Sequence, residues 1–335
     1  MLFINSTTHD RRYQHNSFNR IFYANAIVPA DTLDIRYNSY YFAGVASNHI
    51  YLGNNTAPTH LLMANTSLKG TQHVQLEVEN IAFKSILVKV DSPDFYLMDG
   101  TMPFIYSGKV GDWHASRCTF DSTYFIEAIP VAHKSFILRA MGTQFYKNVL
   151  AKKTVSPSQL KYADNLLEKQ VNGIFCTDGM LIYNKHLAKL VYVYFYRNQF
   201  MCIDTSLNLL YKANTIDTIS KAQIKVANVT SSNTLTMAAP PLVVNKKCSV
   251  FGNWLFINSN LLAGNEDRRI FDRSAVIDVY NLQEGRYKFS FYIPDHMEKK
   301  INSFLVSDHT LVALNDHYLL SYKLNEALFS DESSR

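Results

Sequence analysis

The side chains of this sequence that could do chemistry are scattered and do not gather in a known motif. Asp99 and Asp178 each precede a glycine. Two carboxylates that face one funnel could hold a cation or act as a general acid and base. Asp-Gly is also a favoured turn pair, so the ordinary interpretation of both residues is a tight turn.

Five further residues complete the set of binding candidates. His60 stands at the start of a strand-like run beside a proline-bearing loop, where a structural histidine is more common than a catalytic one. Arg139 and Arg197 could bind an anionic ligand, or could cover apolar surface with their stems. Asn55 and Asn258 lie in neighbouring predicted loops. The predicted binding residues are therefore Asn55, His60, Asp99, Arg139, Asp178, Arg197 and Asn258.

The signatures of common enzymes are absent from the sequence. It contains no GxSxG, Walker loop, GxGxxG or HExxH. Its one SxxK match, at residues 158–161, lies in a predicted loop without the companion motifs of that family. No Cys/His cluster has zinc spacing. We therefore predict neither a metal site nor a cofactor, and assign no catalytic residue.

Composition favours an all-β globular protein. The chain has 335 residues, of which 47% are hydrophobic, enough to bury a large core. Its 21 Tyr and 21 Phe against 12 Gly and 9 Pro favour strands. The net charge of +5 comes from scattered basic pairs, which excludes a nucleic-acid-binding stripe. The longest apolar run, residues 190–196, is too short to span a bilayer and suits a buried strand.

A strand–turn–strand unit recurs along the chain and would position the candidate residues. Each copy joins two apolar runs through a short polar turn, and the copies lie at residues 41–53, 86–98, 124–139, 180–196, 247–257 and 302–314. Second hairpins follow several of them, most clearly at residues 60–78, 199–212 and 275–291. Two hairpins in series make a four-stranded antiparallel meander.

Six such meanders predict an all-β fold, a six-bladed β-propeller over residues 20–325. The last unit lacks a strand, and residues 20–28 at the N-terminus could supply it and close the ring. Residues 156–170 resemble a loop with one helical turn, and residues 223–227 could be an extra strand. Seven blades are therefore the alternative, and a pair of β-sandwiches is the rival fold.

The four cysteines test this strand map. Cys118, Cys176, Cys202 and Cys248 all lie in apolar strand-like runs, where cysteine behaves as a small buried hydrophobe. Cys176 and Cys202 fall on or near the first and third strands of one blade, about 9–10 Å apart at the usual strand spacing. That separation exceeds disulfide reach, so we predict four free thiols.

The meander pattern resembles the six-bladed β-propeller proteins of Bacteroidota, a broad and mostly uncharacterised group that is often exported or membrane-anchored. The resemblance covers about residues 20–325 and rests on the strand pattern, since WD40, kelch and NHL signatures are absent. It implies the fold and a periplasmic or cell-envelope location. It transfers no catalytic residue.

The two ends of the chain also bear on location. Residues 1–4 are apolar and residues 5–19 are polar and basic, too short a pattern for a signal peptide or a membrane span. We expect residues 1–19 to form a disordered or anchor-proximal tail, and residues 326–335 a polar tail. Membrane association would come through a segment upstream of Met1. A frayed cytoplasmic terminus is the alternative, and we expect a monomer.

The predicted fold limits where a site could lie. In propellers, the loops from second to third strands and from fourth to first strands share one face. Residues 53–60, 99–103 and 258–274 would lie there. We predict a non-enzymatic binding or scaffold propeller for a protein or small-molecule ligand. The alternatives are a lyase or hydrolase using a polar funnel on that face, and a periplasmic redox-partner protein.

Overall fold

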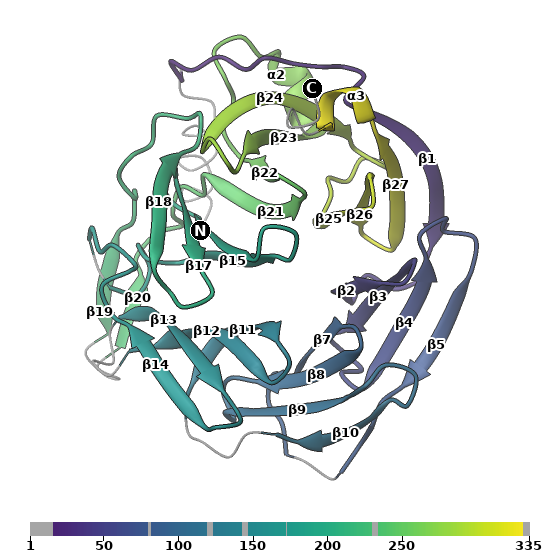
Figure 1. Cartoon of the computed structure of the whole chain (residues 1–335). Coiled ribbons are helices and arrows are strands. Elements are labelled where there is room, and N and C mark those ends of the chain that lie inside the picture. The colour runs from purple at the N-terminus through teal and green to yellow at the C-terminus, as the bar shows by residue number, and fades with distance from the viewer. Residues whose placement is uncertain are drawn as a thin grey trace.

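In the computed structural model, six sheets, each built on four antiparallel strands, surround a central axis and form a six-bladed β-propeller (Figure 1). The structure describes residues 16–79, 82–118, 123–142, 147–171, 173–229 and 234–330. The all-β, six-bladed prediction is therefore confirmed, and within these ranges the alternatives of seven blades and paired sandwiches are wrong.

Blades one to five each use four consecutive strands, ordered from the central axis outward. Blade one contains β2 (Tyr40–Ala46), β3 (His49–Asn54), β4 (His60–Asn65) and β5 (Thr71–Gln75). Blade two contains β7 (Leu87–Asp91), β8 (Asp94–Asp99), β9 (Phe104–Lys109) and β10 (His114–Arg117), with the short β6 (Glu77–Val78) added beside β10. Blade three contains β11 (Phe125–Ala132), β12 (Ser135–Met141), β13 (Asn148–Thr154) and β14 (Gln159–Ala163).

The second half of the ring follows the same order. Blade four contains β15 (Gly179–Asn184), β16 (Lys189–Tyr194), β17 (Gln199–Asp204) and β18 (Leu209–Asn214). Blade five contains β21 (Asn245–Phe251), β22 (Trp254–Ser259), β23 (Ser274–Asn281) and β24 (Arg286–Pro294). Blade six contains β25 (Ser303–Ser307), β26 (Thr310–Asn315), β27 (Tyr318–Leu324) and, outermost, β1 (Ile27–Asp34).

The N-terminal strand closes the ring, as predicted, but with different bounds. In Figure 1 the purple β1 lies beside the yellow β27, and the two pair antiparallel from Ile27–Leu324 to Asp34–Tyr318. The closing strand is therefore 27–34 and not 20–28. Pro29 fits this position because an edge strand tolerates a residue without a backbone N–H.

Strand pairing assigns the secondary structure of two segments that the sequence left ambiguous. Residues 156–170 contain β14, which pairs with β13, so the prediction of a loop with a helical turn is wrong. The strand has five residues, the first four of which alternate between exposed and partly buried positions, a pattern too short to stand out from the surrounding polar residues. Near residues 223–227, β19 (Val226–Val229) pairs only with β20 (Thr234–Met237), so this hairpin does not form a blade.

The core is divided among the contacts between neighbouring blades. The second strand of each blade is buried along nearly its whole length, because blades pack on both of its faces. Val191 and Val193 of blade four, for example, cluster with Leu255 and Ile257 of blade five. This packing fixes each first strand at the axis.

Helices contribute little to the described chain. The helix α2 (Arg268–Asp272) lies in the long loop of blade five. The helix α3 (Glu326–Phe329) follows β27, and the Trp254 indole N–H donates to the Phe329 carbonyl over 3.1 Å. No helix in the described ranges has the length and apolar character needed to cross a membrane.

Arg20 anchors the segment before β1 to blade five. The side chain is buried, and it donates to both carboxylate oxygens of Asp278 over 2.7 and 3.1 Å. It also donates to the Ser259 hydroxyl and the Leu261 carbonyl, and it forms an ion pair with Glu266. All five guanidinium N–H groups are therefore used.

We expect Arg20→Met to lower the free energy of unfolding by about 3–5 kcal/mol, because it leaves buried carboxylates without their cation. Urea unfolding measures the effect. Arg286→Met, at the exposed start of β24, is the matched control and should change stability little. A loss for Arg20→Met no larger than that of the control would contradict this role.

Candidate functional site

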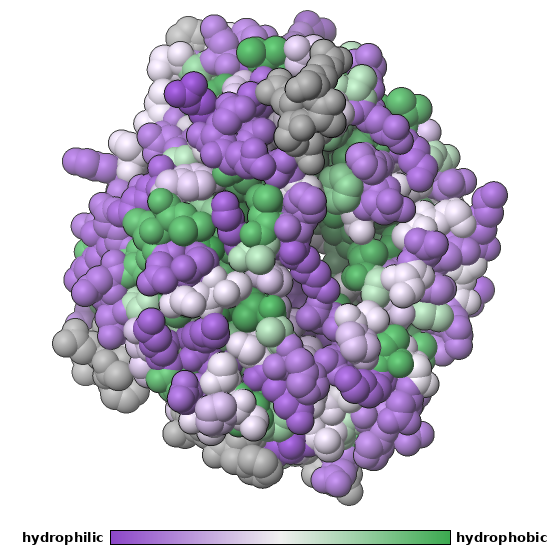
Figure 2. Space-filling model, viewed as in Figure 1, coloured by the Kyte–Doolittle hydropathy of each residue, from purple (hydrophilic) through white to green (hydrophobic). Residues whose placement is uncertain are grey.

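The first strands of the six blades surround a cavity of about 440 Å³ on the axis of the ring. Every one of β2, β7, β11, β15, β21 and β25 contributes side chains to its wall. In Figure 2 the middle of the ring is hollowed, and both hydrophilic and hydrophobic residues border the hollow. The cavity is therefore the point where all six repeats meet.

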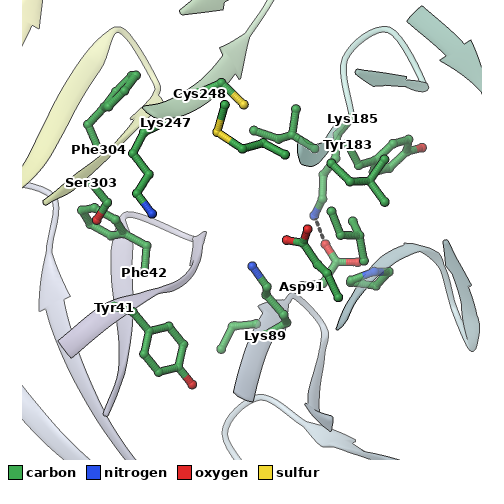
Figure 3. Close-up of a pocket in the computed structure, with 17 residues that line it drawn as sticks. Tyr41, Phe42, Lys89, Asp91, Tyr183, Lys185, Lys247, Cys248, Ser303 and Phe304 are labelled. Atoms are coloured by element: carbon green, nitrogen blue, oxygen red, sulfur yellow. Dashed lines mark ion pairs between the residues drawn. The ribbon is translucent and has the colours of Figure 1, made fainter. Parts of the chain in front are cut away.

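The charged residues of this central cavity are three lysines and two acids. Lys185 forms an ion pair with Asp91, drawn as a dashed line in Figure 3. Glu127, on β11, is the cross-strand neighbour of Arg139 on β12. The formal charge of the lining is thus positive.

Lys89 and Lys247 are the two lysines outside this ion pair, and they outnumber the remaining acid, Glu127. Their amino groups turn toward the middle of the cavity in Figure 3, one from β7 of blade two and one from β21 of blade five. Within the described ranges, neither side chain has an ion-pair or hydrogen-bond partner. Two like charges that share a confined space attract a bound anion.

Apolar and aromatic side chains make up much of the remaining wall, including Phe42, Met180 and Phe304. Tyr41 holds a fixed position because its hydroxyl accepts the Val88 backbone N–H over 2.7 Å. Burial raises the pKa of Tyr41 to about 12, so the hydroxyl keeps its proton. Gly53 makes room for this ring, since a Cβ there would lie 2.3 Å from it.

Cys248 is the one thiol on the cavity wall among the described lining residues. Burial raises its pKa to about 12, so it stays protonated at neutral pH and is a poor nucleophile. None of the four cysteines forms a disulfide. Cys202 lies on β17, the third strand of blade four, while Cys176 precedes β15.

Of the predicted site residues, the structure brings Arg139 and Asp178 together. Arg139 on β12 and Asp178, just before β15, form an ion pair between blades three and four. The Asp178 carboxylate also accepts the Gly179 backbone N–H over 3.1 Å. The pair thus joins two blades at the edge of the ring face that holds the loops between second and third strands.

Asp99 has a different environment. Its fully buried carboxylate accepts the backbone N–H groups of Lys84 and Ser85 on one oxygen, over 2.7 and 2.8 Å. The other oxygen accepts the N–H and hydroxyl of Thr101 and the N–H of Met102. This carboxylate therefore links two loops and has no free position for a ligand.

The other four predicted residues lie apart from the cavity lining. The His60 ring bonds to His73 over 2.9 Å on β4 and β5, and Asn55 lies exposed in the loop before them. Arg197 is buried with its guanidinium 3.6 Å over the Tyr194 ring. Asn258 is buried and donates to the Val276 carbonyl over 3.0 Å.

Sequence reasoning missed Lys89 and Lys247. Both interrupt apolar first strands, in Leu87-Val-Lys-Val-Asp91 and in Asn245-Lys-Lys-Cys-Ser-Val-Phe251. Alternation along a strand places every second side chain on one face, so a charged residue within the first strand of a blade was the available signal. A charged residue in a strand is predicted to lie on the axis only once that strand is known to be the first of its blade.

Comparison with known proteins shows a likeness of fold. No family model and no curated protein matches the chain. The chain resembles a Bacteroides fragilis protein described as thought to be exported, with a TM-score of 0.52 and 11% identity over 93% of this chain and 99% of that one. It also resembles a member of the DUF4221 family from Bacteroides vulgatus, with a TM-score of 0.51 and 12% identity over 92% and 99%.

A third solved structure with this fold is a catalytically inactive variant of virginiamycin B lyase from Staphylococcus aureus with quinupristin. Its TM-score is 0.50, with 10% identity over 88% of this chain and 99% of that one. Identities this low show the fold alone. The resemblance to uncharacterised propellers of Bacteroidota, expected from the strand pattern, is confirmed at that level.

The buried Asp99 carboxylate makes a pH-dependent contribution to stability. Burial alone would raise its pKa, but hydrogen bonds from Ser85, Lys84 and Thr101 outweigh burial and lower that pKa from 3.8 to about 2. The stabilisation is therefore present above about pH 4 and is lost as the pH falls toward 2.

We expect Asp99→Asn to lower the free energy of unfolding by about 2 kcal/mol at pH 7, because an amide nitrogen cannot accept hydrogen bonds. Urea unfolding from pH 7 to pH 2.5 should show the gap between variant and wild type shrinking below about pH 4. Asp112→Asn, at an exposed turn, is the control. A gap that stays constant over this range would contradict the assignment.

Proposed function

We propose that this protein is a non-enzymatic binding propeller and that its central cavity takes a small organic anion. The observation that carries the proposal is the convergence of Lys89 and Lys247, both without partners in the described chain, on a cavity of about 440 Å³. An anion between them would relieve the repulsion of two ammonium groups.

The rest of the wall supports an organic ligand over a simple inorganic ion. Phe42, Met180 and Phe304 offer apolar surface beside the two lysines. Ligand sites typically combine such a wall with a few charged or polar groups that fix orientation. The adjacent Asp91 is neutralised by Lys185, so Glu127 is the one remaining acid of the described lining against Lys89 and Lys247.

The groups around the cavity suit binding better than catalysis. No histidine stands among the described residues that line it, and the Cys248 thiol is protonated at neutral pH. A lyase or hydrolase on the loop face would need Asp99, Asp178, His60 or a neighbouring arginine to converge, and among the described residues Arg139 and Asp178 form the one such pair. Asp99 is instead enclosed by backbone N–H groups, and His60 bonds to His73.

Isothermal titration with benzoate tests the cavity. We expect wild-type protein to bind benzoate and the double variant Lys89→Gln/Lys247→Gln to bind it about tenfold more weakly or worse, because charged hydrogen bonds are lost. Lys69→Gln, on an exposed turn of blade one, removes one charge elsewhere and should change nothing. Absence of benzoate binding by the wild type, or equal binding by the double variant, would overturn the proposal.

We further propose a cell-envelope or periplasmic location. Its support is the fold likeness to a Bacteroides fragilis protein described as thought to be exported. Fractionation of the source organism, followed by immunoblotting of the endogenous protein, should recover it with envelope or periplasmic markers. Recovery with cytoplasmic markers alone would contradict this location.

A further inference from the structure

A second cavity, the lower chamber, lies where first strands turn into second strands in blades four to six. It has a volume of about 660 Å³, and its wall includes Tyr183, His186, Phe251, Trp254, His309 and Phe329. The His309 and Phe251 rings meet edge to face at 4.9 Å. Aromatic rings therefore dominate this chamber, in contrast to the charged central cavity.

The lower chamber and the central cavity share a border. Tyr183 and Lys185, at the end of β15 and in the turn after it, line both. The ion pair from Lys185 reaches Asp91 of blade two, whereas residues of blades four to six line the lower chamber. A ligand in the central cavity could therefore extend into the lower chamber.

Asn184 and Trp254 of the lower chamber make their hydrogen bonds within the protein, whereas Nδ1 of His309 is buried without a hydrogen-bond partner in the described chain. The Asn184 side chain donates to the Gly252 carbonyl over 2.8 Å and accepts the Leu187 N–H over 3.0 Å. The Trp254 indole N–H donates to Phe329. A sugar needs free donors and acceptors for its hydroxyl groups, whereas an aromatic ring needs apolar faces and edges. The aromatic wall therefore suits an aromatic ring, and His309 Nδ1 offers one polar contact beside it.

The strand β21 sets the distance between the charged central cavity and the aromatic lower chamber. Lys247 faces the central cavity, and Phe251, four residues along the same strand, faces the lower chamber. Four residues of extended strand rise about 13 Å. The anionic group and the ring of one ligand would therefore be about 10–13 Å apart, since the lysine side chain can reach along the channel.

We propose that the two cavities form one bipartite site for an elongated organic anion that carries an aromatic ring at its far end. This inference rests on the proposed function, because Lys89 and Lys247 hold the anionic end. It adds the aromatic lower chamber and the spacing between the two ends as determinants of which ligand binds.

Fluorescence titration with 6-(dansylamino)hexanoate tests the bipartite site, since a long chain separates its carboxylate from its ring. Dansylglycine keeps both groups at a short spacing, and N-hexyl dansylamide lacks the carboxylate. We expect the long acid to bind at least tenfold more tightly than either analogue. Ser307→Phe, which fills the lower chamber, should weaken the long acid about tenfold and leave dansylglycine unchanged.

Ser206→Phe, on an exposed turn of blade four, is the matched control and should have no effect. If Ser307→Phe lowers the thermal unfolding midpoint, Ser330→Phe at the exposed rim of the same chamber replaces it. The bipartite site would be overturned by equal affinity for the long and short acids, or by an unchanged affinity when the chamber is filled. In either case Lys89→Gln/Lys247→Gln would still weaken benzoate binding. Loss of the lysine effect itself would instead overturn the proposed function.

Discussion

The strand β1 lies along β27 through a ladder that runs from Ile27–Leu324 to Asp34–Tyr318. Without it, blade six would have three strands and β27 would present an open edge. Because blades pack face to face around a circle, the position of each first strand depends on all the others. The cavity on the axis exists only while this closure holds, and the buried Arg20 network secures the chain leading into it.

The charged residues that first suggest chemistry mostly stabilise the loop face. Asp99 gathers backbone N–H groups from two loops. The Arg139–Asp178 pair joins blades three and four. A buried charge is tolerated where partners satisfy it. Backbone N–H groups do so for Asp99, and Asp178 pairs with Arg139, whose Nε is buried without a hydrogen-bond partner in the described chain. The loops are therefore held in place, and the site that remains open lies at the axis.

At the axis, the balance of charge and apolar surface changes along the channel. Lys89 and Lys247 leave the central cavity with a positive charge, and the lower chamber beside it is aromatic. Neither property belongs to a single repeat, since six different first strands supply the central wall. A repeated fold can thus carry an asymmetric site, because the inward positions are free to differ while the packing positions stay apolar.

The sequence by itself determined the six hairpin units, their turns and the all-β class, because strand alternation and turn chemistry are local properties. It also indicated that an N-terminal strand closes the ring. Only the tertiary structure decided which residues form that strand, that residues 159–163 complete blade three, and that residues 226–237 form a separate hairpin. It alone brought Lys89 and Lys247 to one cavity. Such proximity arises from closure of the ring, which joins residues far apart in the chain, and no local pattern encodes it.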